Sequence, residues 1–225
     1  MGMRQGAGVR GLAARLALCA ILAALLPSRA SQVAAATYEV GPGKTYTTIA
    51  GVPSLQPGDI VEISPGTYYE VKRWTDAGTA DQPITIRGVG ATRPVVDATG
   101  RTVDGALPNP RAVFQVEASN VVIENLEFTN ARNGNNGAGI RVTTCGVTTV
   151  NTVIRNCRIT YCDMGVMCNG NDDLLIEYCE IAFNGTDLYS GYSHNLYLGG
   201  GRTTLRFCHV HDSLHGQNVK SRGRD

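Results

Sequence analysis

The chain has 225 residues, with 20 Lys and Arg against 19 Asp and Glu, which gives a formal net charge of +1. This balance argues against a general nucleic-acid binder, because such proteins carry a strongly basic face. Beyond its first few tens of residues, the chain is rich in Gly, Asn, Thr, Val and Ile and shows almost no helical periodicity.

The first 36 residues have the pattern of a secretory signal peptide. Arg residues precede an apolar run of eleven residues from Leu16 to Leu26, and Pro27 ends that run. The run is too short to span a bilayer, and the three alanines at 34–36 offer a cleavage site. We therefore predict a signal peptide over 1–36, a secreted or periplasmic protein, and no membrane attachment after cleavage. Because this segment carries four Arg and no acidic residue, cleavage leaves 189 residues with a formal net charge of −3.

The mature chain begins with a segment unlike the rest. Residues Thr45 to Asp59, TYTTIAGVPSLQPGD, combine a short amphipathic stretch with a Pro-Gly-Asp turn. We predict a short helix over Thr47 to Leu55. Candidate strands follow, each rich in aliphatic or β-branched residues and bounded by turn residues: Asp59 to Ile63, Pro83 to Gly88, Pro94 to Ala98 and Ala112 to Val116.

Four similar segments then recur at irregular intervals. They start at Val122, Val153, Leu175 and Thr204, so the starts are 31, 22 and 29 residues apart. Each has an aliphatic residue second, Leu or Cys fifth and an apolar residue last. A second short apolar stretch follows each of them: Gly139 to Val142, Gly165 to Cys168, Asn195 to Leu198 and Asn218 to Ser221.

Short strands in repeats of this length indicate a solenoid in which each repeat makes one coil. One coil cannot bury its own apolar side, but coils stacked about 4.8 Å apart bury a continuous core and pair their backbone groups. The first coil needs a polar cap, which is the role we give to the predicted helix over Thr47 to Leu55. No matching cap follows near Asp225. We therefore expect the domain, 37–225, to be incomplete at its C-terminus or covered there by a partner.

The stretch TYEVGPGKTYTTIAGVPSLQPGDIVEISPGTYYE, followed by GTADQPITIRG, resembles the opening of secreted β-helix proteins of the pectate-lyase-like superfamily. It looks most similar to polysaccharide lyases that act on alginate and chondroitin-type chains. The resemblance covers Tyr38 to Gly90 as sequence and the remainder as repeat pattern. It implies an all-β fold, a right-handed single-stranded parallel β-helix with a short N-terminal capping helix. The same opening precedes lyases, hydrolases and epimerases, so the fold does not settle the reaction.

The strongest candidate site is a basic strand near the end of the chain. If Val219 points into the core, alternation along the strand turns its neighbours outward. Equivalent residues of earlier coils would extend this face, rimmed by the loops Thr129 to Ala138 and Ala182 to His194, and would suit an acidic sugar chain. The residues predicted to share it are Arg141, Met167, Asn195, Tyr197, Asn218, Lys220 and Arg222.

Cleavage of a uronate chain by β-elimination requires a group that neutralises the carboxylate, a base and an acid. In the lyases that this sequence resembles, an Arg and a Lys on one face fill the first two roles. The resemblance thus implies these roles for Arg222 and Lys220, unless both are simply solvated charges. His211 and His215 flank the loop that enters the basic strand, where they supply an acid or base or simply belong to a polar loop.

Calcium is the one cofactor that the sequence brings into consideration. The run Asn169-Gly170-Asn171-Asp172-Asp173 clusters oxygen ligands, although the same residues suit a tight turn. None of the four His belongs to a helical metal-binding pair, so we assign no metal-ligating residues and expect no zinc hydrolase.

Six cysteines remain after the predicted cleavage. Cys157, Cys179 and Cys208 share one repeat position, and three thiols in a row cannot all pair, so we favour a reduced interior ladder. Cys145 and Cys162 fall in predicted turns and are the better candidates for a disulfide.

The resemblance makes a lyase-like enzyme acting on an acidic polysaccharide the leading hypothesis, with the oligomeric state left open. A glycoside hydrolase would need outward carboxylates on neighbouring coils. Asp163, Asp187 and Asp212 fall in suitable loops but not in one register. A uronan epimerase or a non-catalytic carbohydrate-binding protein would also be compatible with this fold.

Overall fold

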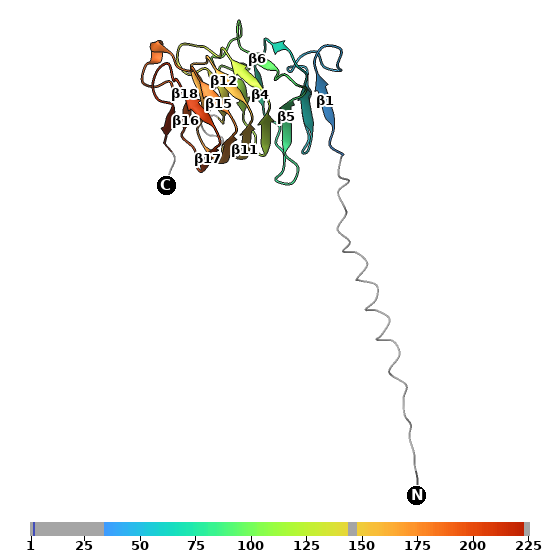
Figure 1. Ribbon diagram of the computed structural model, residues 1–225. Coiled ribbons are helices and arrows are strands. Elements are labelled where there is room, and N and C mark those ends of the chain that lie inside the picture. The colour runs from blue at the N-terminus through green and yellow to red at the C-terminus, as the bar shows by residue number, and fades with distance from the viewer. Residues whose placement is uncertain (1, 3–33, 144–147, 223–225) are drawn as a thin grey trace. The chain divides into compact units, whose positions relative to one another are not determined.

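Stacked coils of short parallel strands build the protein from Ala35 onwards (Figure 1). The structure is a computed structural model that describes residues 2, 34–143 and 148–222. Its strands form three parallel sheets of seven, six and six strands, which we name sheets A, B and C. Each coil passes through sheet A, then B, then C, so neighbouring strands of a sheet come from neighbouring coils.

The strands are two to seven residues long. Sheet A contains β1 (Thr37–Val40), β2 (Ile60–Ile63), β5 (Ile84–Gly88), β8 (Val121–Glu124), β11 (Thr149–Arg155), β14 (Asn171–Glu177) and β17 (Thr203–Arg206). Sheet B contains β3 (Thr67–Tyr68), β6 (Val95–Asp97), β9 (Glu127–Thr129), β12 (Arg158–Thr160), β15 (Glu180–Ala182) and β18 (His209–His211). Sheet C contains β4 (Lys72–Trp74), β7 (Ala112–Val116), β10 (Ala138–Val142), β13 (Met164–Cys168), β16 (Leu196–Leu198) and β19 (Val219–Ser221).

Helix is almost absent from this fold. Within 34–143 and 148–222 the only helical element is the 3-10 turn η1 (Asp187–Tyr189). The same ranges hold no helix with the length and apolar character needed to cross a membrane.

The four sequence repeats are confirmed as four successive coils. Each repeat bends sharply just before its fifth residue, so its two halves enter sheet A and sheet B. The residues at these bends have a positive φ: Asn125 (57°), Asn156 (50°), Tyr178 (54°) and Phe207 (54°). Asn adopts this left-handed conformation more readily than other non-glycine residues. The Tyr178 and Phe207 rings stack across neighbouring coils with centroids 5.0 Å apart.

One continuous core runs through the coils because alternate residues of each strand point inward. In β5, Ile84 and Ile86 are buried, whereas Thr85 and Arg87 are partly exposed. Trp74, Phe114 and Phe128 come from three successive coils and pack edge to face, with centroids 5.4 and 4.9 Å apart. This is the geometry that aromatic quadrupoles favour, so the coils are joined by side-chain packing as well as by backbone hydrogen bonds.

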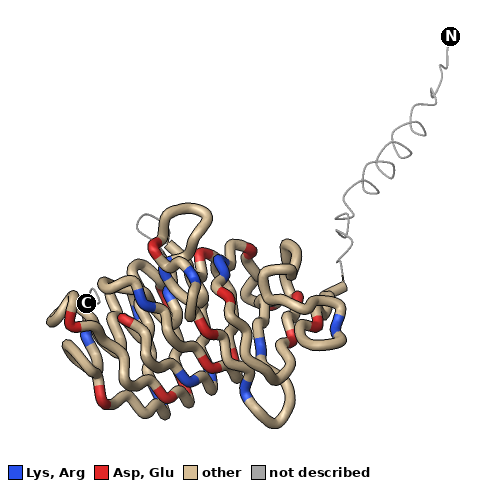
Figure 2. Tube along the Cα trace, turned by 90° about the horizontal axis from the view of Figure 1, so that it is seen from above, with Lys and Arg blue, Asp and Glu red and all other residues tan. Residues whose placement is uncertain are grey.

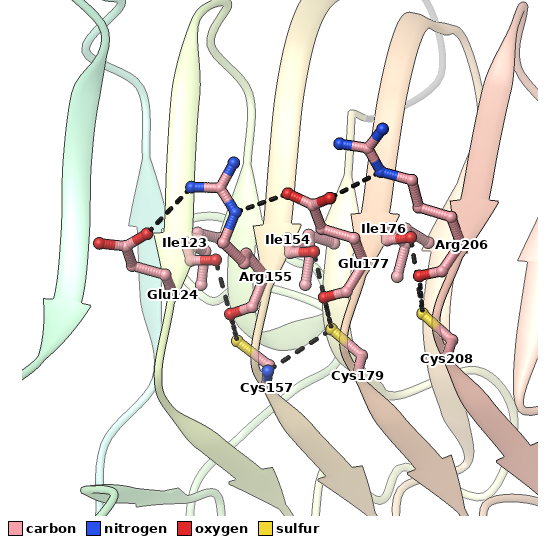
Figure 3. A network of polar contacts seen from close by, with 10 residues as sticks. All are labelled: Ile123, Glu124, Ile154, Arg155, Cys157, Ile176, Glu177, Cys179, Arg206 and Cys208. Carbon is pink, nitrogen blue, oxygen red and sulfur yellow. Dashed lines mark hydrogen bonds and ion pairs between the residues drawn. The ribbon is translucent and has the colours of Figure 1, made fainter.

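The residues that follow the bends form an interior row, which consists of Leu126, Cys157, Cys179 and Cys208. The Sγ atoms of Cys157 and Cys179 lie 3.2 Å from the carbonyl oxygens of Arg155 and Glu177, and the three thiols of the row are free (Figure 3). The predicted reduced ladder is confirmed.

The disulfide proposed for Cys162 is not present. Its thiol is free and buried, and its Sγ accepts a hydrogen bond of 3.4 Å from the backbone N–H of Ala131. Cys145, the other half of that proposed pair, lies outside the described residues.

A capping segment packs against the first coil, but the predicted helix over Thr47 to Leu55 is wrong. The chain passes through bends and a turn there. Ile49, Val52 and Leu55 are nevertheless buried in the core cluster, so the apolar spacing identified the inward residues correctly. Gly51 and Pro53 disfavour a helix, because Gly loses more backbone entropy than other residues when it is ordered and Pro lacks an N–H donor.

Charged side chains of the first coil replace the missing helical hydrogen bonds. The Glu70 carboxylate accepts from the backbone N–H groups of Ile49 and Ala50 at 3.1 and 2.8 Å. The Lys72 Nζ donates to the carbonyl oxygens of Ile49 and Val52, both at 2.9 Å. The cap is therefore an irregular segment held by long-range contacts.

Candidate functional site

The outer face of sheet A carries a row of alternating, mutually neutralised charges. Arg155 and Arg206 donate to the two oxygens of Glu177 at 2.6 and 2.7 Å (Figure 3). The hydrogen bond from Arg155, supported by Arg206, holds the pKa of Glu177 below its ordinary value even though burial opposes this. The members of the row, in coil order, are Glu62, Arg87, Glu124, Arg155, Glu177 and Arg206.

Sheet B has a shorter row of the same kind. Arg158 pairs with Glu127 at 3.2 Å and with Glu180 at 3.1 Å. The His211 ring continues it, with Nε2 3.7 Å from Glu180 and Nδ1 2.8 Å from Asp212. Basic and acidic residues are thus interspersed along the coils, as Figure 2 shows.

Sheet C is charged differently. Its outward row is, in coil order, Arg73, Gln115, Arg141, Met167, Tyr197 and Lys220. Arg73 forms an ion pair with Glu117. Farther along, Arg141, Lys220 and the nearby Arg222 have no carboxylate partner among the described residues. Sheet C therefore presents uncompensated positive charge, and it is the candidate site.

Arg141 is the most deeply buried cation of this row, with only 7% of its surface exposed. Its Nη1 atom lies 2.9 Å from the Met167 Sδ and 3.5 Å from the Asn136 carbonyl oxygen. Burial, with a contribution from Arg111, lowers the pKa of Arg141 to about 10, so it is still charged at neutral pH. A cation in a partly desolvated position attracts an anion more strongly than one in water does.

Tyr197 and Lys220 face each other across neighbouring strands of sheet C. His194 is buried and stacks on the Tyr197 ring, with centroids 6.0 Å apart. The His194 Nδ1 accepts a hydrogen bond of 3.0 Å from the Gln217 backbone N–H. Burial, together with Lys220 and Arg222, lowers the pKa of His194, which favours the neutral ring. His194 is therefore a buried, hydrogen-bonded histidine, and its stack supports the Tyr197 ring from inside the coil.

The prediction that Asn195 faces outward is wrong. The residue is fully buried; its Nδ2 donates to the His211 carbonyl oxygen at 2.6 Å and to the Asn218 Oδ1 at 2.8 Å. Its own Oδ1 accepts from the Asn184 Nδ2 at 2.9 Å. Alternation fails because the chain is still turning from sheet B into sheet C at this position. In the preceding coil Gly165 occupies it, where a Cβ atom would lie 2.3 Å from the Asn195 carbonyl oxygen.

Asn218 is exposed, but its side chain turns toward the same corner. Its Oδ1 accepts from Asn195 and also from the Ser213 backbone N–H at 3.0 Å. Its exposure agrees with the predicted outward face, and a contact of Asn218 with substrate stays a prediction. Both amides hold the corner together and leave the ligand-facing part of the row to Arg141, Tyr197 and Lys220.

The two histidines predicted to be catalytic, His211 and His215, lie outside the basic strand. His211 belongs to β18 of sheet B, among the carboxylates already described, whereas Lys220 belongs to β19 of sheet C. His215 lies in the loop between these strands, where its carbonyl oxygen accepts from the Ser213 hydroxyl at 2.8 Å. Acid or base roles for His211 and His215 stay predictions.

The three aspartates considered for a glycoside hydrolase have separate surroundings. Asp163 is buried and accepts from the Asn133 and Asn135 backbone N–H groups at 2.7 and 3.2 Å, which fixes the loop before β10. Asp187 begins η1, and Asp212 lies beside His211. None of these contacts pairs one of the aspartates with another.

The run considered for calcium divides between a turn and a strand. β14 begins at Asn171, whose buried Nδ2 donates to the hydroxyls of Thr149 and Thr152 at 2.6 and 3.0 Å. Asp173 pairs with Arg202. Among the residues that the structure describes, no three His, Cys, Asp or Glu side chains form a group suited to a metal. Calcium binding stays a prediction.

These features define a right-handed parallel β-helix with one cationic face. A family model described as a right handed beta helix region matches residues 96–221, more than half of the chain. The chain therefore belongs to the right-handed β-helix family. No curated protein matches it in sequence.

Several solved structures share the fold. A pectin methylesterase from Aspergillus niger aligns with a TM-score of 0.53 and 15% identity, over 78% of this chain and 56% of that one. An alginate lyase from Paenibacillus sp. aligns with a TM-score of 0.53 and 18% identity, over 74% of this chain and 56% of that one. A pectate lyase aligns with a TM-score of 0.51 and 16% identity, over 78% and 46%. The chain thus spans about half the length of these proteins, and identities this low show a common fold alone.

Proposed function

We propose that this protein is an exported, lyase-like enzyme that acts on an acidic, uronate-containing polysaccharide at the outer face of sheet C. The proposal rests on one observation. Arg141, Lys220 and Arg222 have no carboxylate partner in the described part of the chain, whereas the charged rows of sheets A and B are paired. A face of one charge sign attracts a polymer of the other sign. The fold shared with an alginate lyase and a pectate lyase supports this substrate class, and the predicted signal peptide supports export.

The proposed reaction divides the three roles of β-elimination among these residues. A cation, Arg222 or Arg141, neutralises the uronate carboxylate by a charge-assisted hydrogen bond. The Lys220 amine acts as the base and takes the C5 proton; the C5–H electrons form the C4–C5 double bond, and the C4–O bond breaks. Tyr197, which lies across from Lys220, gives its hydroxyl proton to the leaving oxygen.

An assay with alginate, pectate and chondroitin tests the reaction. We expect the ultraviolet absorbance of unsaturated uronate ends to rise, and Lys220→Ala to lower kcat by roughly a hundredfold to ten-thousandfold, the usual contribution of a general base. Lys44→Ala is the matched control, because Lys44 is a partly exposed lysine paired with Glu39 on another part of the molecule. Full activity of Lys220→Ala would remove the role of Lys220.

The same assay separates elimination from hydrolysis and from binding without catalysis. Reducing ends released without new absorbance would indicate hydrolysis. Binding without either product would indicate a non-catalytic carbohydrate-binding protein. Either result would contradict the proposed elimination.

A further inference from the structure

The loop between β15 and β16 exposes an apolar cluster. Leu188, Tyr189 and Tyr192 are 76%, 40% and 62% exposed. Isolated apolar side chains are common on protein surfaces, but three within five residues form a patch, and patches of this kind mark binding sites. The two tyrosine rings contact each other, with centroids 5.0 Å apart and planes 36° apart.

The exposed rings of Tyr161, Tyr178 and Phe207 have a structural role that Tyr189 and Tyr192 lack. Tyr161 stacks on Phe183 of the next coil with ring centroids 5.7 Å apart. Tyr178 stacks on Phe207 in the same way, so both pairs join successive coils. Among the described residues, the ring contact of Tyr189 and Tyr192 is made within a single loop. Their exposure is therefore not explained by the stacking of coils.

The loop is closed at its base by buried hydrogen bonds. The Thr186 backbone N–H donates to the Ser193 hydroxyl at 3.0 Å, and that hydroxyl donates to the Thr186 carbonyl oxygen at 3.2 Å. The Asn184 and Asn195 side chains join the two strand ends at 2.9 Å. Inside the loop, η1 is capped by Thr186. A platform fixed in this way loses little conformational freedom when a ligand binds.

The loop lies beside the cationic row. It returns to sheet C through His194, which stacks on Tyr197 at the outer face. At its other side, the Leu188 Cδ1 lies 3.0 Å from where a Cβ atom would sit on Gly134. Gly134 belongs to the loop before β10, and that loop also provides the Asn136 carbonyl oxygen near Arg141. The loop that carries the aromatic pair is therefore linked through Leu188 to the loop beside Arg141 and through His194 to Tyr197.

We propose that Tyr189 and Tyr192 form a stacking platform that binds the face of a pyranose ring in the acidic polysaccharide. This inference rests on the proposed function and adds a second recognition element to that site. A pyranose has a face of C–H groups that packs on the π-face of an aromatic ring, while its carboxylate and hydroxyl edge stays polar. The cations of sheet C recognise charge, and the tyrosines recognise the sugar ring independently of charge.

Calorimetric binding of alginate, pectate and neutral glucan oligosaccharides to the full chain, at low and at high salt, tests the platform. We expect the double variant Tyr189→Ala/Tyr192→Ala to bind about tenfold to a hundredfold more weakly, which corresponds to the loss of two ring contacts. Its salt dependence should equal that of the wild type, because no charge is removed. Tyr189→Phe/Tyr192→Phe should keep the affinity, since the ring faces remain. Tyr69→Ala, which removes an exposed tyrosine in the first coil, is the control.

The outcomes separate the platform from the proposed function. If the double alanine variant binds uronate chains as tightly as the wild type does, the platform is overturned and the cationic site is unaffected. If the wild type binds only neutral polysaccharide and the double alanine variant does not bind it, the platform is supported and the proposal of an acidic substrate is overturned. A wild type that binds neither kind of polymer would overturn both.

Discussion

Glu177 shows how a single residue stabilises two coil contacts at once. Only 3% of its side chain is exposed, and each carboxylate oxygen is held by an arginine of an adjacent coil, Arg155 on one side and Arg206 on the other. A charge buried to this degree is tolerated because its hydrogen bonds replace those of water. Arg155 and Arg206 in turn share Glu177 as a buried counter-charge.

Replacing that carboxylate should cost stability. We expect Glu177→Gln to lower the free energy of unfolding by about 1–3 kcal/mol, because two charge-assisted hydrogen bonds lose their charged acceptor. Urea denaturation measures the change. Glu180→Gln in sheet B is the matched control, since Glu180 also pairs with an arginine but its side chain is 38% exposed, so it should cost about 1 kcal/mol or less. Equal losses in the two variants would contradict the importance of burial.

The same contacts predict a pH dependence. The pKa of Glu177 in the folded protein is lowered, first by the hydrogen bond from Arg155, whereas in the unfolded chain it returns to its ordinary value of about 4.3. The unfolded state therefore binds more protons just below that value, and the contribution of Glu177 is fully present above it and is lost as the pH falls from it through the lower pKa of the folded state. Melting temperatures measured from neutral to acidic pH should fall less steeply in Glu177→Gln than in the wild type. Parallel curves would contradict this assignment.

At the scale of elements, alternation and repeat spacing predict the strands well, because a half-buried strand must alternate wherever it stacks. The capping segment shows the limit of that method. Its apolar residues Ile49, Val52 and Leu55 have a helical spacing, yet the groups that satisfy their backbone, such as Glu70, lie about twenty residues later in the chain. Long-range partners of this kind leave no mark on local sequence.

The interior row of thiols also belongs to the scale of elements, because Cys157, Cys179 and Cys208 occupy the same position in successive repeats. Cys162 is a buried thiol outside this row. The hydrogen bond with Cys157 raises the pKa of Cys179 to about 12, and burial raises that of Cys162 to about 12. Thiolate is the reactive form, so iodoacetamide at about pH 8 should leave Cys162 and Cys179 unmodified in the folded protein. Peptide mass spectrometry should find both alkylated after denaturation in urea. Rapid modification of either residue in the native protein would show that the coils open.

At the scale of the whole molecule, the sequence predicts the solenoid and the cationic composition of β19 but not the charge balance between faces. The neutral rows of sheets A and B become visible only when the register places Arg and Glu of neighbouring coils side by side, as it does for Arg158 between Glu127 and Glu180. The same register places Tyr197 beside Lys220, as predicted, while the turn between sheets B and C removes Asn195 from the face. Local pattern therefore predicted most members of the candidate site, and the three-dimensional register removed Asn195 from it.

The asymmetry between faces predicts a conflict between stability and binding at Arg141. The residue is buried without a carboxylate, and its lowered pKa of about 10 means that folding disfavours the charged form at every pH below that value. Arg141→Met places in the row the side chain that Met167 already provides one coil later, and removes the buried charge. We expect it to raise the free energy of unfolding by about 1–2 kcal/mol and the melting temperature by roughly 2–6 °C.

The same variant should bind acidic oligosaccharides more weakly and with a shallower dependence on salt, since one cation has been lost. Calorimetry of unfolding and of binding measures both effects, and Arg202→Met, which changes an exposed arginine outside sheet C, is the control. A variant that is less stable yet binds as the wild type does would show that Arg141 serves the fold and not the ligand.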